Sequence, residues 1–321
     1  MLLSLLADKL GLLYSGNPNR DISRVSSPDD PDTLSICPVW DKAVLAKLPP
    51  SAPVIMKQDY FNIPPLRDGL ICDNPRAILP ELLALFAPTQ LPKGSHHSAV
   101  ISPQAHVSPN SYIGPNAYIG PDCFIGDFTV VEPNAVLLAN VKTGTHCLIH
   151  SGAVLGCDGF GFERTPKGLV KIPQTGGVTL GDNVEIGACT AIDRGTFNDT
   201  VIGSGTKIDN HVQIGHNVKI GRNCIICAMS GVAGSSVIED NVTVAVQAGI
   251  TDHVTVGKNS VIAGRSGVTN DVPEGSVFSG FPARNHNDAK RALVLACDLP
   301  LIVKRLKTLE KKLEALLKSC C

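Results

Sequence analysis

From Ile101 onward an aliphatic side chain returns at every sixth position, and no other feature of the chain restricts its fold as strongly. Ile, Val or Leu occupies 24 of the 25 positions in this register, and Thr143 is the single exception. The register runs through residues 101–155, 180–192 and 202–268. An α-helix repeats every 3.6 residues and a strand every two, so neither element alone produces this period.

A six-residue period is typical of a parallel β-helix, in which each short strand sends one bulky side chain into the interior. Three strands make a coil of about 18 residues, and successive coils stack at about 4.8 Å. Gly often follows the aliphatic residue, as at Gly114 and Gly215, and suits the corners between strands. The chain is therefore predicted to be mainly β, with a left-handed parallel β-helix of hexapeptide repeats.

The same register divides the chain into three parts. Residues 1–98 lack it and combine short apolar runs with a helical stretch, which predicts a small α/β domain, whereas residues 99–283 form the β-helix. Residues 284–321 are predicted to form an α-helical extension, because their apolar residues are spaced three and four apart. This seam consists of Leu299, Ile302, Leu306, Leu309, Leu313 and Leu316. The seam suits packing on symmetry mates, and the excess of Lys and Arg around it suits an acidic partner.

Charge and cysteine content argue against several classes of protein. A net charge of −1 and an aromatic content of 4% give no indication of nucleic acid as a partner. Residues 1–10 are better interpreted as an amphipathic helix than as a signal peptide, and no apolar run reaches the roughly 18 residues of a transmembrane helix. The odd number of cysteines, 11, favours a reducing, cytoplasmic location with at most peripheral membrane contact.

Two insertions interrupt the period. One lies between Leu155 and Leu180, and the other, which contains Asp193-Arg194-Gly195, lies between Ile192 and Ile202. A solenoid accommodates insertions as loops that leave one face, and loops on a rigid scaffold often carry function.

Coil-length spacings predict a site along one edge of the β-helix. Gly234 follows His216 by 18 residues and His253 follows it by 37, which is two coils plus one residue. A base, a backbone N–H donor and a second polar group, spread over roughly 10 Å of a groove, suit acyl transfer. Alternatively, these are corner histidines without a chemical role. A zinc site with His211, as in β-helical carbonic anhydrases, is disfavoured because the close histidine pair precedes the isolated one, so no metal is expected.

A series of motifs is similar to one enzyme family. In chain order these are Asp158-Gly-Phe-Gly-Phe162, Lys171-Ile-Pro-Gln174, Val184-Glu-Ile-Gly-Ala188, Ile192-Asp-Arg-Gly195, Asp199-Thr-Val-Ile-Gly203, Ile208-Asp-Asn210, His216-Asn217 and Ser279-Gly-Phe-Pro282. Together they closely resemble UDP-3-O-acylglucosamine N-acyltransferase of lipid A biosynthesis. The N-terminal domain matches more loosely, through Leu6–Gly11, Val25–Pro28 and Asp73–Pro75.

The resemblance implies a homotrimer with active-site grooves between adjacent subunits and no resident cofactor. The donor would be a 3-hydroxyacyl chain on the phosphopantetheine of acyl carrier protein, an acidic partner for the C-terminal helix. The acceptor would be the 2-amino group of UDP-3-O-(3-hydroxyacyl)glucosamine. His216 aligns with the general base and Asp209 is expected to orient it, while Gly234 matches the oxyanion donor and His253 is expected to contact substrate.

The resemblance also assigns substrate binding to Trp40, Asn74 and Gly267. Where the family's uridine pocket typically reads Phe-x-Ser-Asn-x-x-Tyr, this chain has Leu34-Ser-Ile-Cys37-Pro-Val-Trp40, so Trp40 is expected to stack on uracil without the Asn hydrogen bonds. Gly267 occupies a slot where some relatives place Met, which predicts a deeper acyl groove and a longer chain.

Two other functions stay open from the sequence. The sister O-acyltransferase family, which acylates the 3-hydroxyl of UDP-N-acetylglucosamine, lacks a separate N-terminal domain and the Asp-Gly-Phe-Gly-Phe insertion. A non-catalytic β-helical scaffold is the alternative from a different class, because the repeat is structural in itself.

Overall fold

The computed structural model describes residues 1–87, 93–280 and 286–319. The chain forms two compact units, Met1–Leu91 and Pro92–Cys321. The sequence places the first boundary after residue 98, whereas strand β6 (Gly94–Ser95) already pairs in parallel register with β9 (Tyr112–Ile113) of the β-helix. The described coils therefore begin a few residues before the expected boundary.

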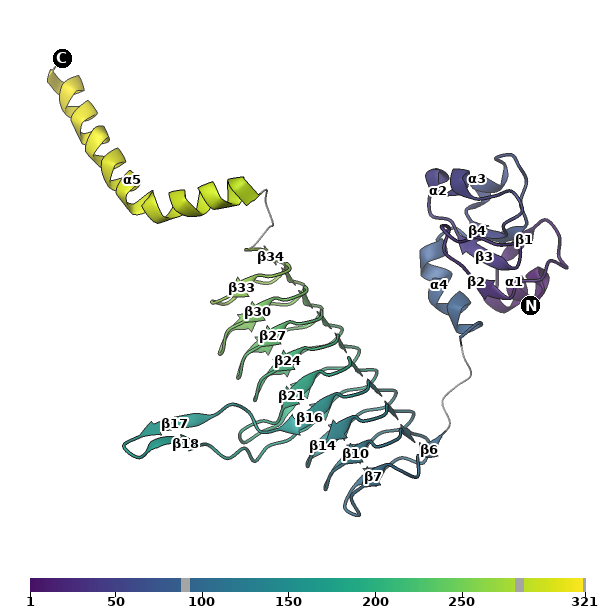
Figure 1. Ribbon diagram of the computed structural model, residues 1–321, viewed down its shortest axis with the longest axis horizontal. Coiled ribbons are helices and arrows are strands. Elements are labelled where there is room, and N and C mark those ends of the chain that lie inside the picture. The colour runs from purple at the N-terminus through teal and green to yellow at the C-terminus, as the bar shows by residue number, and fades with distance from the viewer. Residues whose placement is uncertain (88–92, 281–285, 320–321) are drawn as a thin grey trace. The chain divides into compact units, whose positions relative to one another are not determined.

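The N-terminal unit is a small α/β domain built on a five-stranded sheet of order β1-β5-β4-β3-β2 (Figure 1). Its strands are β1 (Leu13–Ser15), β2 (Arg24–Val25), β3 (Ser35–Pro38), β4 (Val54–Met56) and β5 (Gly69–Ile71). Its helices are α1 (Leu3–Leu10), α2 (Lys42–Lys47), α3 (Gln58–Phe61) and α4 (Pro75–Ala84). Strands β2 to β5 are parallel neighbours, and only β1 pairs antiparallel.

Both faces of this sheet are buried, because successive strand residues point to opposite sides. Ile36 and Ile55 pack in one apolar cluster with Leu3, Leu6 and Leu82 from α1 and α4. The neighbouring strand residues Cys37, Val54 and Met56 belong to a second cluster with Leu45 and Phe61 from α2 and α3. This alternation gives the domain three layers, with α1 and α4 packed on one face of the sheet and α2 and α3 on the other.

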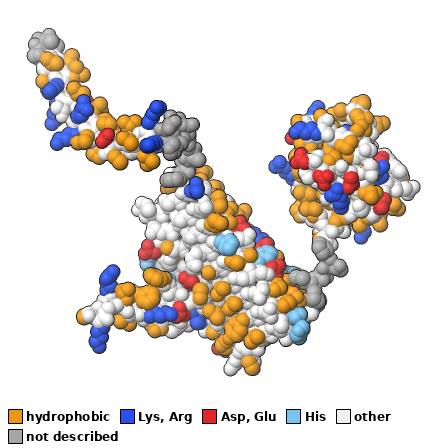
Figure 2. All heavy atoms as spheres, in the orientation of Figure 1, with side chains coloured by type: hydrophobic (Ala, Val, Ile, Leu, Met, Phe, Trp, Pro, Cys, Tyr) orange, Lys and Arg blue, Asp and Glu red, His pale blue; other side chains and the backbone are white. Residues whose placement is uncertain are grey.

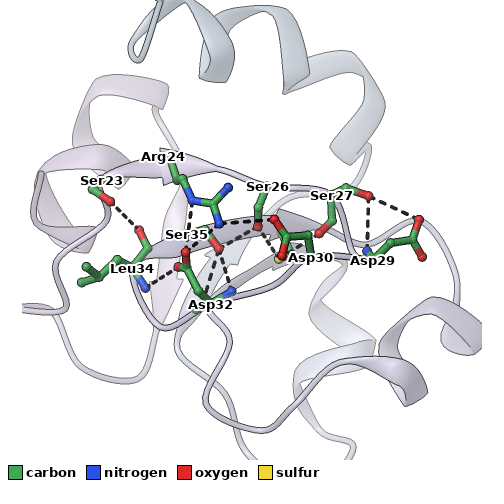
Figure 3. A network of polar contacts seen from close by, with 10 residues as sticks. Ser23, Arg24, Ser26, Ser27, Asp29, Asp30, Asp32, Leu34 and Ser35 are labelled. Atoms are coloured by element: carbon green, nitrogen blue, oxygen red, sulfur yellow. Dashed lines mark hydrogen bonds and ion pairs between the residues drawn. The ribbon is translucent and has the colours of Figure 1, made fainter.

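Polar contacts join β2 to β3 inside the same unit (Figure 3). The hydroxyl of Ser26 donates to that of Ser35 at 2.6 Å and lies 3.1 Å from the Cys37 thiol. At the surface, the side chain of Arg24 and the backbone N–H of Leu34 donate to Asp32 and lower the pKa of its carboxyl to about 2. The Val25–Pro28 motif thus has a structural role in this domain.

The second unit contains a parallel β-helix with three faces, which we call the first, second and third (Figure 1). The first face comprises β7 (Val100–Ile101), β10 (Tyr118–Ile119), β13 (Val136–Leu137), β16 (Val154–Cys157), β21 (Ala191–Asp193), β24 (Gln213–Ile214), β27 (Gly231–Val232), β30 (Gly249–Ile250) and β33 (Gly267–Val268). The second comprises β8 (His106–Val107), β11 (Phe124–Ile125), β14 (Val141–Thr143), β19 (Val178–Leu180), β22 (Thr200–Ile202), β25 (Lys219–Ile220), β28 (Val237–Ile238) and β31 (Thr255–Val256). The third comprises β6, β9, β12 (Val130–Val131), β15 (Leu148–Ile149), β20 (Glu185–Ile186), β23 (Lys207–Ile208), β26 (Ile225–Ile226), β29 (Thr243–Val244), β32 (Val261–Ile262) and β34 (Val277–Phe278).

The hexapeptide register produces this solenoid directly, and the predicted left-handed parallel β-helix is confirmed. Ile101, Ile119 and Leu137 stack in register across three coils. The one polar slot, Thr143, is also buried, and its hydroxyl accepts the backbone N–H of Gly126 at 3.0 Å. Left-handed backbone conformations recur at the corners, as at Asn116 with φ of 57° and Asn134 with φ of 61°. The buried Thr143 hydroxyl thus has a backbone partner, and the Asn corners adopt a conformation that Asn tolerates.

Both insertions leave the β-helix from neighbouring strands of the first face. Strand β16 pairs with β21, and the pairing is irregular where Cys157 lies opposite Asp193. Beyond β16 the chain forms a protruding antiparallel hairpin of β17 (Phe162–Thr165) and β18 (Gly168–Lys171), as Figure 1 shows. In Figure 2 basic side chains lie at its tip. The predicted placement of the insertions on one face is confirmed.

The C-terminal extension contains helix α5 (His286–Ser319), which bends in Figure 1 and has Pro300 in its interior. Its seam residues from Leu299 to Leu313 are 42–63% exposed in the single chain. Phe281 and Pro282 of the last family motif lie outside the described residues. Within the parts of the chain that the structure describes, no helix is long and apolar enough to cross a membrane.

The third face carries one histidine held between two carboxylates. His150 Nδ1 lies 3.1 Å from Glu132 Oε2, and His150 Nε2 lies 3.1 Å from Glu185 Oε1. Burial by itself lowers the pKa of His150, but the hydrogen bonds to Glu185 and Glu132 outweigh burial and raise it overall. Only the imidazolium donates from both ring nitrogens, so the protonated form stabilises this contact.

Replacing His150 by Gln is expected to remove a pH-dependent part of the stability. A histidine pKa raised in the folded state gives stability that is complete below the unfolded value of about 6.5 and is lost as the pH rises through the folded value. The partly exposed site limits the effect to about 1 kcal/mol. The wild-type advantage over His150→Gln, measured by urea unfolding, should shrink between about pH 6 and pH 9. An advantage independent of pH would contradict this account.

Candidate functional site

A groove of about 1040 Å³ follows the edge of the first face and the base of the hairpin. Its floor is formed by strands β24, β27, β30 and β33 and by the corners that follow them. Four of the sequence-predicted site residues line it: His216, Gly234, His253 and Gly267. The structure therefore brings together the residues that the coil-length spacing places on one edge.

Backbone hydrogen bonds stack the three corners along that edge. The N–H of Ser235 donates to the carbonyl of His216 at 2.8 Å, and the N–H of His253 donates to the carbonyl of Gly234 at 3.3 Å. His253 adopts the left-handed corner conformation, with φ of 56°, and its side chain is exposed. The imidazoles of His216 and His253 thus belong to corners two coils apart, with Gly234 between them.

Two glycines confine the His216 ring. A Cβ built on Gly234 would lie 2.7 Å from His216 Nε2, and one built on Gly159 would lie 2.5 Å from His216 Cβ. Atoms at these distances overlap, so neither position has room for a side chain while the ring stays in place. Gly234 lies next to Nε2 in the groove, and Gly159 of the first insertion covers the side of the ring.

A hydrogen-bonded chain reaches His216 through the other ring nitrogen. Asn217 Nδ2 lies 2.8 Å from His216 Nδ1, and Asn217 Oδ1 accepts the backbone N–H of Thr196 at 2.7 Å. Thr196 Oγ1 in turn donates to Gln174 Oε1 at 2.8 Å, and Gln174 Nε2 donates to the carbonyl of Ile172 at 3.0 Å. Both insertions therefore contribute to holding the His216 ring.

Asp193 is one of three carboxylates that line the groove, with Asp158 and Asp252, and its charge interacts with His216. It lies at the end of β21, lines the groove and accepts a hydrogen bond from Cys157 Sγ at 3.2 Å. Burial raises the pKa of Asp193, and the effects of Cys157, Gln213 and His216 reduce that rise only partly. Burial and the contact with Asp193 raise the pKa of Cys157 to about 12, so its sulfur serves as a thiol donor.

Within the single chain, Asp209 and His216 lie on different edges of the coil, so the role expected of Asp209 stays a prediction. Asp209 follows β23 of the third face, whereas His216 follows β24 of the first face, one corner later. The carboxylate of Asp209 accepts the backbone N–H groups of Asn210 at 2.7 Å and Ala228 at 3.1 Å, and it lines a separate groove of about 470 Å³. Seven residues of separation place the two side chains on different edges of the triangular coil.

Trp40 and Asn74 belong to the N-terminal unit. Trp40 follows β3, and its ring centroid lies 5.4 Å from the guanidinium of Arg76. Asn74 caps α4, and its side-chain oxygen accepts the N–H of Ala77 at 3.3 Å. Both residues lie at the carboxyl ends of parallel strands, β3 and β5, where ligands commonly bind in α/β sheets.

Gly267 ends a row of three aligned glycines. Gly231, Gly249 and Gly267 stack in register on β27, β30 and β33. A Cβ added at any of them would meet no atom within 4 Å. This part of the groove floor is therefore open backbone surface, and a side chain at any of the three positions would fill part of the groove.

The structure also separates His211 from the groove. His211 occupies a corner after β23, with φ of 57°, and does not line the site with His216 and His253. Across residues 1–87, 93–280 and 286–319, no three His, Cys, Asp or Glu side chains are grouped to hold a metal ion.

Comparison with known proteins identifies similar chains. The bacterial transferase hexapeptide family (six repeats) matches residues 199–234. UDP-3-O-acylglucosamine N-acyltransferase of Methylorubrum populi is 45% identical over 147 residues, which are 46% of this chain and 42% of that protein. The enzyme of Bordetella pertussis with the same name is 35% identical over 189 residues, 57% of this chain and 52% of that protein. The chain thus spans about half the length of the curated relatives it matches.

Solved structures give the same fold. LpxA from Acinetobacter baumannii is 28% identical, with a TM-score of 0.54 over 59% of this chain and 72% of that one. UDP-N-acetylglucosamine acyltransferase from Campylobacter jejuni is 27% identical, with a TM-score of 0.51 over 56% of this chain and 68% of that one. The matches to the curated relatives confirm the resemblance to UDP-3-O-acylglucosamine N-acyltransferase that the motifs indicate.

Proposed function

We propose that the protein transfers a 3-hydroxyacyl chain from acyl carrier protein to the 2-amino group of UDP-3-O-(3-hydroxyacyl)glucosamine. The observation that carries this proposal is the edge on which His216, Gly234 and His253 stack inside one groove. The chain matches about half the length of relatives that are named N-acyltransferases, and these names support the N-acyl rather than the O-acyl reaction.

The groove provides the groups that amide formation from a thioester requires. The acceptor nitrogen attacks the thioester carbonyl carbon, the N–C bond forms, and the carbonyl electron pair moves onto oxygen, where the Gly234 N–H donates to the oxyanion. The imidazole of His216 accepts the proton that the nitrogen loses. Collapse breaks the C–S bond, and the imidazolium returns the proton to the thiolate, which leaves amide and free phosphopantetheine thiol.

Surface features support the partners that belong to this proposal. Phe160 and Phe197, one from each insertion, are 87% and 82% exposed in the single chain, as expected if neighbouring subunits of a homotrimer cover them. Helix α5 offers Lys and Arg side chains to the acidic carrier, and Trp40 offers an aromatic face to uracil. The nine cysteines in the described part of the chain are free, which agrees with a cytoplasmic location.

The direct test is turnover by the purified full-length protein with two acceptors. With 3-hydroxyacyl carrier protein as donor, the expected product is the amide from UDP-3-O-acylglucosamine, detected by mass spectrometry. Acylation of UDP-N-acetylglucosamine alone would instead establish the sister O-acyltransferase reaction. Absence of turnover with both acceptors across a series of chain lengths would favour the non-catalytic scaffold.

Replacing Gly267 by Met is expected to shorten the preferred acyl chain. The added side chain meets no atom within 4 Å at its Cβ, so it can extend into the groove without disturbing β33. Each methylene excluded from an apolar groove costs about 0.8 kcal/mol, roughly a fourfold change in kcat/KM. A donor series of increasing chain length measures this shift. An unchanged length preference in Gly267→Met would show that the acyl chain does not follow the row of glycines.

A further inference from the structure

One carboxylate in the groove has no role in the steps above. Asp193 is partly buried, lines the groove and lies close enough to His216 for their charges to interact. The strand register explains the proximity, because Ala191 pairs with Gln213 and Ile192 with Ile214. Asp193 and His216 therefore lie beside each other on adjacent coils.

The groups around Asp193 leave its charge without a cationic side-chain partner in the described part of the chain. On one side, Cys157 donates to it as a neutral thiol, and Gln213 contributes a neutral amide. Lys171 is paired with Asp158, and the Arg194 side chain donates to the carbonyls of Gly176 at 2.8 Å and Ala139 at 3.2 Å. The neighbouring groups therefore provide Asp193 with hydrogen bonds and the imidazole of His216, but no Lys or Arg pairs with it.

We propose that the Asp193 carboxylate binds the amino group of the acceptor as an ammonium and so selects an amine over a hydroxyl acceptor. This inference rests on the proposed function. An ammonium has three donors and a positive charge, and a carboxylate is its natural acceptor. Hydrogen bonds between two charged groups are about twice as strong as neutral ones. A hydroxyl in the same place supplies one neutral donor and leaves the carboxylate charge uncompensated.

The position of Asp193 beside His216 also suits the reaction. Asp193 and His216 line the same groove, so an ammonium held by Asp193 lies near the imidazole. The ammonium loses one proton to solvent before its nitrogen can attack, and His216 takes up the second proton as the N–C bond forms. The elevated pKa of Asp193 supports the same conclusion, since burial disfavours the carboxylate until a cation enters. A site built around a polar substrate group discriminates strongly against analogues that lack it.

The test compares two ligands that differ at one atom. Calorimetry without acyl donor measures the binding of UDP-3-O-acylglucosamine and of its analogue with a hydroxyl in place of the 2-amino group. The full-length wild type is expected to bind the amine at least about tenfold more tightly. Asp193→Asn is expected to weaken amine binding by roughly tenfold to a hundredfold and hydroxyl binding by less than about threefold.

Asp127→Asn is the matched control and should keep the wild-type preference, because Asp127 follows β11 of the second face and does not line the groove. The inference would be overturned if Asp193→Asn lost affinity for both ligands equally, or lost affinity for neither. If Asp193→Asn does not fold, equal affinity of the wild type for the two ligands overturns it as well.

Turnover separates this inference from the proposed function. Wild-type amide formation combined with an unchanged preference in Asp193→Asn sinks only the role of Asp193. A preference that Asp193→Asn abolishes, in a protein that forms no amide with any donor, supports an amine-binding carboxylate and overturns the proposed reaction.

Discussion

Replacing His216 by Ala is expected to lower kcat/KM for amide formation by roughly 10²–10⁴-fold, the usual contribution of a general base. The substitution removes the ring whose Nε2 lies beside Gly234, while the backbone carbonyl of residue 216 still accepts the N–H of Ser235. The aliphatic interior of the coil is untouched, because His216 lies at a corner outside the core. Steady-state kinetics with 3-hydroxyacyl carrier protein measures the loss.

Two controls give that result its meaning. The variant should keep the wild-type circular dichroism and sedimentation coefficient, since the β-helix core does not contain residue 216. Asp127→Asn should keep near wild-type turnover, because Asp127 lies on the second face, outside the groove. Full activity in folded His216→Ala would remove the base from the mechanism, and a protein inactive in both forms would favour the scaffold.

The second large effect on turnover is expected from replacing Gly159, the glycine that packs against His216. Replacing Gly159 by Ala puts a Cβ 2.5 Å from His216 Cβ and 2.7 Å from His216 Cδ2, so the ring or the insertion has to move. A displacement of about 1 Å in a catalytic group costs on the order of 10²-fold in rate. We therefore expect kcat of Gly159→Ala to fall about a hundredfold while the protein stays folded.

Gly264→Ala is the matched control for this clash. A Cβ there would lie 3.4 Å from the carbonyl oxygen of Val246, an ordinary contact, and Gly264 does not line the groove. Its turnover should match the wild type. Wild-type kcat in Gly159→Ala would show that the first insertion moves away from His216 at no cost, and so that it does not position the ring.

How much of the site was predictable depends on the kind of contact. His216, Gly234 and His253 were predicted because residues one coil apart stack whatever their side chains are. The contacts of the first insertion were not predicted, because Gly159 packs against His216, which follows 57 positions later in the chain. Two signals marked these segments: the interruptions of the period contain Gly159, Gln174, Asp193 and Thr196, and the motifs of the resemblance contain the first three of them. Asp209 was assigned from the resemblance, and its position on a different edge from His216 became visible only in the folded coil.

The sequence by itself determined the β-helix, its register and the edge on which the candidate site lies. The physical reason is that each hexapeptide buries its own aliphatic residue and parallel pairing fixes the 18-residue offset between coils. Only the tertiary structure decided which groups surround His216. The insertions obey no repeat, so their conformation follows from long-range packing and hydrogen bonding, through which Gly159, Gln174 and Thr196 confine the ring and Asp193 joins it in the groove.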